Sequence, residues 1–439
     1  MSGNATTNDL WAALSEASGK DVKTFMDAWI TKIGFPVVTV AEEPGQIGVQ
    51  QSRFLSAGDV NPEEDTTQWW IPLGLKTANN ATPASQELAT KAETLRNVDE
   101  SFYKFNSYQN GFYRTNYPPE RLAKLGAEKS KLAVEDRIGL VADAEAMAVA
   151  GLGTTAGLLT LVEKFQDESS KAVFAQIAGS LATIRSAFAE NEAVTRGLQA
   201  FTQQLFSPVA EKVGWKQAQG EDYLTGQLRA LAIRVVGGAG HQKVIQEAQR
   251  QFAAYVSGDK TAIHPSLRIP VFRIVIENGG ASEYKALKNE YAQTTSIDGK
   301  DVCLTAMGQV PTAELAKDFL DFQFSDEVAT QDVHTGSISL ASNPKGRRVL
   351  WDYFRSEWKT VSNKLAARPI IMDRYIKSTL SKYASQEMEQ SISDFFKDKN
   401  TEGYDRGLQQ VLDKVRTNAR YRERDEMLVL EWLQAHQYA

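Results

Sequence analysis

The sequence is poor in the residues that build disulfide frameworks and thiolate metal sites. Its 439 residues include one cysteine, Cys303, so a disulfide within the chain is impossible, as is typical of a protein in a reducing compartment. The four histidines are not followed by the Glu-x-x-His that completes a common zinc motif; they are His241, His264, His334 and His436. We therefore predict a cytoplasmic protein whose chain binds no metal and no other cofactor.

A long hydrophobic run is also missing. The nearest candidate is "AEAMAVAGLGTTAGLLTLV" at 144–162, which contains Glu145 and three glycines. A bilayer span needs about 20 consecutive apolar residues in one helix. The stretch instead predicts two buried helices that meet at a glycine turn, and no membrane partner.

A surplus of positive charge is absent as well. The chain has 49 basic and 55 acidic residues, a formal charge of −6, which argues against nucleic acid as a partner. One basic stretch, "KVRTNARYRERDEM" at 414–427, is interleaved with acidic residues. We interpret it as a solvated helix face with i,i+4 ion pairs, and keep a basic lining of a concave surface as the alternative.

The residues that are present change their pattern twice along the chain. Apolar residues recur at helical spacing from 8 to about 33, with Ser18-Gly19 dividing two helices and Asp21 starting the second. From 36 to 117 the segments are short, rich in β-branched and aromatic residues, and separated by Pro, Gly, Asn or Asp. Their spacing predicts a small antiparallel β-sandwich.

From 119 onward helices dominate. An apolar stripe runs from Leu224 to Val235 and ends at Gly237-Gly238, and the next helix places Val244, Ala248, Phe252 and Tyr255 on one face. A second pair, Gly279-Gly280, follows 42 residues after the first. This period is typical of stacked helical hairpins of the HEAT or armadillo kind. The predicted fold class is mainly α, with the β-sandwich followed by a large α-superhelical domain.

The segment "QNGFYRTNYPPERL" at 109–122 marks the junction between the two patterns. Alternation places Phe112 on one strand face and Tyr113 and Tyr117 on the other, which predicts a last strand with buried aromatics on both faces. Pro119 is suited to the first position of a helix. We interpret this segment as a domain boundary without catalytic groups.

No motif completes a catalytic site. "SEASGKD" at 15–21 resembles the end of a phosphate-binding loop but lacks its first glycine and the Ser or Thr after the lysine. "GLGTTAG" at 151–157 follows no strand, so a tight turn between helices explains it better than a dinucleotide site. By its own residues, the chain is a helical-repeat domain with a small β-domain.

Several segments nevertheless resemble one family in the same order. "DLWAALSEASGK" and "GFYRTNY" are similar to segments of the zinc-dependent gluzincin aminopeptidases of the puromycin-sensitive type, at the end of the catalytic domain and of its β-sandwich. Further matches are "LFSPVAEKVGW" at 205–215, "HPSLRIPVF" at 264–272 and "GRRVLWDYFRSEW" at 346–358. The resemblance covers essentially the whole chain.

The resemblance implies that this chain is the C-terminal half of such an enzyme. It would comprise a helical tail of the catalytic domain (1–34), a β-sandwich (35–118) and an α-superhelical domain (119–439). The family's His-Glu-x-x-His and distant Glu, which hold zinc, are expected in the missing catalytic domain, so this chain alone should be inactive. Its expected role is to shape and gate the peptide cavity, with its own catalytic domain and peptide substrates as partners.

One substrate-binding residue follows from the resemblance. The family segment "ISRLIK" is matched by "IMDRYIK", which makes Arg374 the candidate for binding a substrate carboxylate. A solvated or ion-paired helical arginine is the alternative, and Asp373 is a possible local partner. A stand-alone helical-repeat scaffold that binds a protein through its concave face is the competing interpretation of the whole chain.

Overall fold

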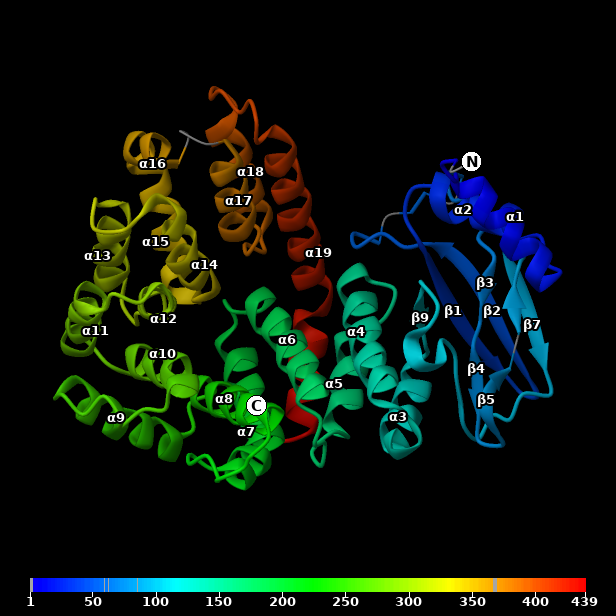
Figure 1. The fold of residues 1–439 in the computed structure, drawn as a ribbon, viewed down its shortest axis with the longest axis horizontal. Helices are drawn as coiled ribbons and strands as arrows, with labels where there is room; N and C mark the ends of the chain where they lie inside the picture. Colours follow the sequence, from blue (N-terminus) through cyan, green and yellow to red (C-terminus); the bar gives the residue numbers. More distant parts are fainter. Residues whose placement is uncertain (1–2, 59, 62, 85, 366–368) are drawn as a thin grey trace. The chain divides into compact units, whose positions relative to one another are not determined.

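A computed structural model describes residues 3–58, 60–61, 63–84, 86–365 and 369–439. The chain divides into two compact units, residues 1–164 and residues 165–439 (Figure 1). It is mainly α-helical, and the strands of the described residues all belong to the first unit, as predicted. The predicted boundaries after residues 34 and 118 both fall within the first unit and stay predictions.

The first unit begins and ends with helices. These helices are α1 (Thr7–Ser18), α2 (Val22–Thr31), α3 (Pro119–Ala127), α4 (Val134–Ala150) and α5 (Thr155–Glu163). Its strands are β1 (Pro36–Glu43), β2 (Gln46–Arg53), β3 (Ile71–Pro72), β4 (Leu75–Thr77), β5 (Asn80–Ala84), β6 (Glu87–Leu88), β7 (Ala92–Arg96), β8 (Tyr103–Lys104) and β9 (Arg114–Asn116).

Local hydrogen bonds explain why the first two helices form where they do. The Thr6 hydroxyl accepts a hydrogen bond from the Asp9 amide, and the Asp9 carboxylate accepts one from the Thr6 amide at 2.7 Å. This reciprocal pair satisfies amides that a helix start leaves without partners. Asp21 caps α2 through the Thr24 amide at 3.1 Å, as predicted from the sequence.

The largest sheet has the strand order β7-β2-β1-β9. Strands β1 and β2 pair antiparallel along their whole length, but β9 pairs with β1 in parallel, with Val38 opposite Thr115. The predicted antiparallel pairing is therefore present in β1, β2 and β7, whereas β9 at the edge departs from it. A parallel neighbour needs a long crossover connection, and the chain between β1 and β9 provides it by passing through the smaller sheets.

The junction segment forms β9 and the start of α3. Tyr113 and Tyr117 are buried, and their hydroxyls are bonded to backbone: Tyr113 donates to the Leu73 carbonyl at 2.6 Å, and the Phe105 amide donates to Tyr117 at 2.7 Å. The predicted alternation is confirmed, but the second aromatic face is not buried, because Phe112 is 72 % exposed. Pro119 is the first residue of α3, as predicted.

Helices α4 and α5 are the two helices predicted in the apolar stretch at 144–162. Gly151, with φ of 77°, ends α4, and α5 starts three residues after Leu152. A left-handed residue at this place is strained for a side chain but open to glycine. Within the part of the chain that the structure describes, no helix combines the length and apolarity required to span a membrane.

The second unit is built of helices alone in its described residues. They are α6 (Lys171–Ala187), α7 (Glu192–Val213), α8 (Tyr223–Gly238), α9 (Gln242–Val256), α10 (Arg268–Asn278), α11 (Ala281–Gln293) and α12 (Ile297–Met307). They continue as α13 (Ala313–Phe324), α14 (Val333–Ser342), α15 (Pro344–Ser356), α16 (Trp358–Leu365), α17 (Pro369–Leu380), α18 (Gln386–Phe396) and α19 (Asp405–Ala435).

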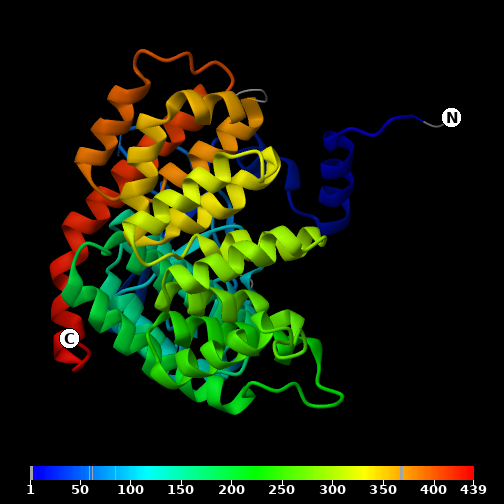
Figure 2. The same cartoon turned by 90° about the vertical axis from the view of Figure 1, so that its left-hand side faces the viewer.

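These helices form two layers, and the inner layer closes on itself. Each inner helix contacts the next in the order α6, α8, α10, α12, α14, α17 and α19, and the long helix α19 returns to contact α6. The other helices pack outside this ring, for example α7 on α8, α9 on α10 and α18 on α19. Figures 1 and 2 show that helices close in sequence lie side by side, so the colour changes gradually from green to red.

Two sequence predictions are confirmed in this unit. Helix α8 ends at Gly238, and α9 buries Val244, Ala248, Phe252 and Tyr255, the four residues predicted to share a face. Apolar stripes of this kind bury each helix against its neighbours and leave the opposite face for other contacts. Assignment to the HEAT or armadillo class stays a prediction.

Candidate functional site

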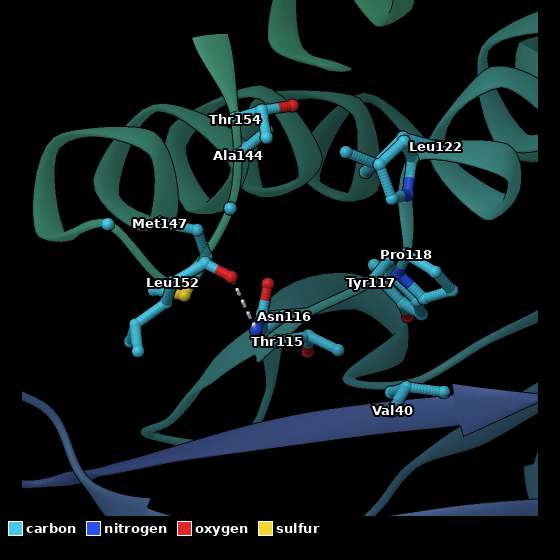
Figure 3. A pocket seen from close by; sticks show the side chains of 13 residues that line it. Val40, Thr115, Asn116, Tyr117, Pro118, Leu122, Ala144, Met147, Leu152 and Thr154 are labelled. Atoms are coloured by element: carbon cyan, nitrogen blue, oxygen red, sulfur yellow. Dashed lines mark hydrogen bonds between the residues drawn. The ribbon is translucent and has the colours of Figure 1, made fainter. Parts of the chain in front are cut away.

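Two cavities lined by described residues offer space for a ligand, one in each unit. The cavity of the first unit, about 290 Å³, lies between β9, the start of α3 and the glycine turn after α4 (Figure 3). None of its lining residues is Asp, Glu, Lys, Arg or His. The Asn116 side chain donates to the Leu152 carbonyl at 3.2 Å and ties strand to turn. This cavity is a packing gap at the junction and offers no charged group for chemistry.

The cavity of the second unit is larger, about 420 Å³, and lies within the ring of inner helices. Its lining comes from α6, α7, α8, α10 and α19, from the ends of α14 and α17, and from the start of α15. Six charged side chains line it: Arg185, Arg234, Arg273, Lys382, Lys414 and Glu277. Five are basic and one is acidic, so the cavity is electropositive in a chain whose formal charge is −6.

The three arginines come from consecutive inner helices and stand in otherwise apolar sequence. Arg185 occurs in "LATIRSAF", Arg234 in "LAIRVVGG" and Arg273 in "PVFRIVIE". The apolar neighbours bury each helix in the unit, which leaves the arginine on the face that points into the ring. Glu277 stands one turn after Arg273 on α10 and therefore faces the same cavity.

Two of these guanidinium groups have no hydrogen-bonded or ion-paired partner among the described residues. Arg185 donates to the Gly238 carbonyl at 3.5 Å. Neither Arg234 nor Arg273, both half-buried, makes a hydrogen bond or an ion pair through its guanidinium with any residue that the structure describes.

Repulsion between the positive charges of the cavity contributes to the pKa shifts of its arginines. Burial lowers the pKa of Arg273 to about 10, and the positive charges of Arg234 and Arg185 contribute to this shift against the attraction of Glu277. Burial, with Arg185 nearby, also lowers the pKa of Arg234. Burial raises the pKa of Glu277, opposed by Arg185, Arg273 and Lys345. Burial thus disfavours the charged form of all three side chains relative to water.

Arg347, in the segment "GRRVLWDYFRSEW", holds the cavity wall together. Its guanidinium donates to the carbonyls of Ala341 at 2.9 Å, Lys382 at 2.8 Å and Ser186 at 3.2 Å, and to the Ser186 hydroxyl at 3.0 Å. These bonds join the ends of α6, α14 and α17. Arg347 is therefore a buried arginine whose donors are used by the fold, in contrast to Arg234 and Arg273.

The sequence-predicted Arg374 lies elsewhere on the second unit. It is an exposed residue of α17 and is not among the residues that line the cavity. Asp373 pairs with Lys377 at 2.6 Å, and the described residues supply no ion pair to the Arg374 guanidinium. The local Asp373–Arg374 pair considered from the sequence is therefore absent, while the role of Arg374 in substrate binding stays a prediction.

The basic C-terminal stretch combines both interpretations that the sequence left open. Arg416 pairs with Glu389 at 2.6 Å, and Arg422 pairs with Glu426 at 3.1 Å, as expected of a solvated helix face. Lys414, in the same stretch, lines the cavity. Among the residues that the structure places, no group of three or more His, Cys, Asp or Glu side chains is arranged to hold a metal ion.

Sequence reasoning missed the three cavity arginines. They are spread over almost ninety positions along the chain, so no spacing motif connects Arg185 to Arg273. A usable signal existed: each is a single cation inside an apolar helical segment, and the three segments belong to successive helical hairpins.

Comparison with known proteins gives the chain its relatives. A family model described as "ERAP1-like C-terminal domain" matches residues 102–417. "Aminopeptidase 2" of Candida albicans is 34 % identical over 99 % of this chain and 48 % of its own length. "Aminopeptidase 2, mitochondrial" of Saccharomyces cerevisiae is also 34 % identical, over 46 % of its length, and "Aminopeptidase M1-D" of rice is 30 % identical over 49 %. The chain thus spans about half the length of these relatives.

Proposed function

Because the chain belongs to the family of ERAP1-like C-terminal domains, we propose that it is the non-catalytic C-terminal part of a cytoplasmic zinc aminopeptidase that removes N-terminal residues from peptides. The observation that carries this proposal is the match of 99 % of the chain to about half of an aminopeptidase. The zinc site and the catalytic base belong to the other half. The chain's own residues contribute to peptide binding.

The helical unit supports a role in shaping and gating the peptide chamber. A closed inner layer of helices gives a rigid wall for such a chamber. A chamber wall of this kind limits access to peptides of suitable size and excludes bulk water from the reaction. Arg374 is the proposed contact for a substrate carboxylate.

The N-terminal helices support attachment to a catalytic half. None of the α1 residues is buried, and Leu10 is 52 % exposed. Ile33, shortly after α2, is 78 % exposed. Exposed apolar side chains on these short neighbouring elements are consistent with a surface that a partner covers. We assign this surface to contact with the catalytic domain.

Assays on the chain alone test the non-catalytic assignment. We expect no hydrolysis of aminoacyl-arylamides above the buffer rate and no stoichiometric zinc by elemental analysis. Robust turnover together with one equivalent of zinc would contradict the assignment. Copurification of a stable protein partner, without any binding of peptides, would favour a stand-alone scaffold instead.

Peptide binding tests the role of Arg374. Fluorescence anisotropy with a labelled decapeptide should show weaker binding to Arg374→Ala than to the unmodified chain, by about tenfold for a lost charge-assisted pair. Arg348→Ala is the matched control, since Arg348 is an exposed helical arginine of α15 outside the cavity. Equal affinities of the two variants would remove Arg374 from the site.

A further inference from the structure

The residues that line the cavity of the second unit carry more positive charge than one peptide carboxylate can neutralise. Arg185, Arg234 and Arg273 line one cavity of about 420 Å³, with Lys382 and Lys414 beside them and Glu277 as the only acidic lining residue. Five positive charges and one negative charge leave a net charge of four positive units. A single carboxylate would neutralise one of these units and leave the others facing each other.

The geometry of the donors also distinguishes between anions. The three guanidinium groups come from three different helices of the inner layer, α6, α8 and α10. A carboxylate offers two oxygens in one plane, which suits one bidentate arginine. A tetrahedral phosphate offers oxygens in several directions and accepts from several arginines at once, with lysines adding point charge. The volume lies within the range of small-molecule sites.

We propose that this cavity binds a small polyanion that carries two or more phosphate groups, held by Arg185, Arg234 and Arg273. Arg234 and Arg273 make the central contacts because their guanidinium groups are unpartnered among the described residues. Arg185 and Lys382 complete the charge on the α6 and α17 sides. Arg347 is a positioning residue, since its bonds to Ser186 and Lys382 fix two parts of the wall.

Glu277 gives the proposal a test of opposite sign. It lies in the same cavity, and its carboxylate repels an incoming anion while it partly neutralises Arg273. Removal of this charge should strengthen anion binding, whereas removal of an arginine should weaken it. If Glu277 and the arginines had only structural roles, their removal would not change the affinity for an anion in opposite directions.

The experiment is calorimetric titration of the full chain with inorganic triphosphate at low ionic strength. We expect one site per chain, and an affinity that falls as salt is added because charges are screened. Arg234→Met and Arg273→Met should each weaken binding by about tenfold or more, and Glu277→Gln should tighten it severalfold. Arg348→Met, which removes an exposed charge elsewhere, should leave the affinity within about twofold.

Several results would overturn the proposal. These are the absence of binding, equal affinities in the unmodified chain and both cavity arginine variants, and weaker binding by Glu277→Gln. Tighter binding of citrate, or of a peptide ending in two glutamates, would assign the cavity to carboxylates instead of phosphates. If an arginine variant loses its circular dichroism spectrum, Glu277→Gln and Lys382→Met decide the outcome. The titration needs no peptidase activity, so its result is independent of the proposed function.

Discussion

The first unit pairs its buried lysine with a carboxylate, whereas the second unit contains two half-buried arginines without a bonded partner among the described residues. In the first unit Lys104 lies 2.9 Å from Asp136, and Arg114 lies 3.0 Å from Asp143, which also accepts the Thr115 amide at 3.0 Å. In the second unit Arg234 and Arg273 line a cavity without any such partner among the described residues. The first arrangement joins sandwich to helix within one unit. The second leaves donors directed into an open space.

We interpret paired buried charges as stabilising the fold, and unpaired charges that line a cavity as marking a ligand site. A buried ion whose partner is removed costs several kcal/mol, so the fold keeps such ions paired wherever they have no other purpose. A cluster of like charges without bonded partners opposes folding, and it suits a site where another molecule supplies the missing charge. Each prediction below changes one side of this comparison.

The largest effect is expected for Asp136→Ala. Lys104 would stay almost fully buried, with only the carbonyls of Phe105 and Asn106 as acceptors. We expect the free energy of unfolding to fall by about 3–5 kcal/mol, measured by urea denaturation. The double variant Lys104→Met/Asp136→Leu should recover a large part of this loss, because no charge stays unpaired. A loss below about 1 kcal/mol in the single variant would contradict the account.

The second prediction concerns pH and Asp143. Burial raises the pKa of this carboxyl to about 6, despite its bonds to the Thr115 amide and to Arg114. The folded chain therefore holds a proton that an unfolded aspartate loses near pH ~3.9. The contribution of Asp143 to stability is complete below about pH 4, declines as the pH rises to about 6, and is constant above it. The change amounts to about 3 kcal/mol at 1.4 kcal/mol per pKa unit.

Asp143→Asn should remove this component. Urea denaturation between pH 4 and 7 should show a flatter stability profile for the variant than for the unmodified chain. Parallel profiles would show that Asp143 is ionised throughout and that its partners outweigh burial.

The third prediction concerns Arg347, the buried arginine of the second unit whose donors are bonded. Arg347→Met leaves the carbonyls of Ala341, Ser186 and Lys382 without their donor, and should lower the free energy of unfolding by about 2 kcal/mol or more. Thermal unfolding followed by circular dichroism gives the readout. A change within about 0.5 kcal/mol would place Arg347 among the dispensable charges.

The smallest effect on stability is expected for Arg273→Met. This change removes repulsion with Arg234 and Arg185, so stability without added anion should stay the same or rise by about 1 kcal/mol. The same thermal measurement, at low salt, compares Arg273→Met with Arg347→Met. A destabilisation equal to that of Arg347→Met would show that Arg273 has a structural partner and would break the comparison.

The local elements were predictable because local chemistry determines them. Asp21 caps α2 and Pro119 starts α3 at the positions that their residue types favour, and α8 ends at the predicted glycine pair, shortly before the left-handed Gly240. The parallel pairing of β9 was not predictable, because it depends on where a long connection returns to the sheet. The exposure of Phe112 was missed for a similar reason: strand alternation divides two faces without showing which face is covered.

The candidate site was harder to predict from the sequence than the fold was. Arg374 followed from a short motif, but its surroundings depend on how α17 packs. Arg234 and Arg273 meet only because α8 and α10 are neighbours in the inner layer, and the cavity closes only because α19 returns to α6. Such convergence is a property of tertiary packing, whereas residue spacing along one helix reports only its own faces.

The central claim is that unpaired charge in the second unit marks a ligand site, and a crystal structure of the full chain grown with inorganic triphosphate tests it most directly. The account predicts density for the anion in the cavity, within hydrogen-bond distance of the Arg234 and Arg273 guanidinium groups, and none beside the paired Lys104 or Arg114. An empty cavity at saturating triphosphate, with both arginines bonded to groups of the chain itself, would contradict it.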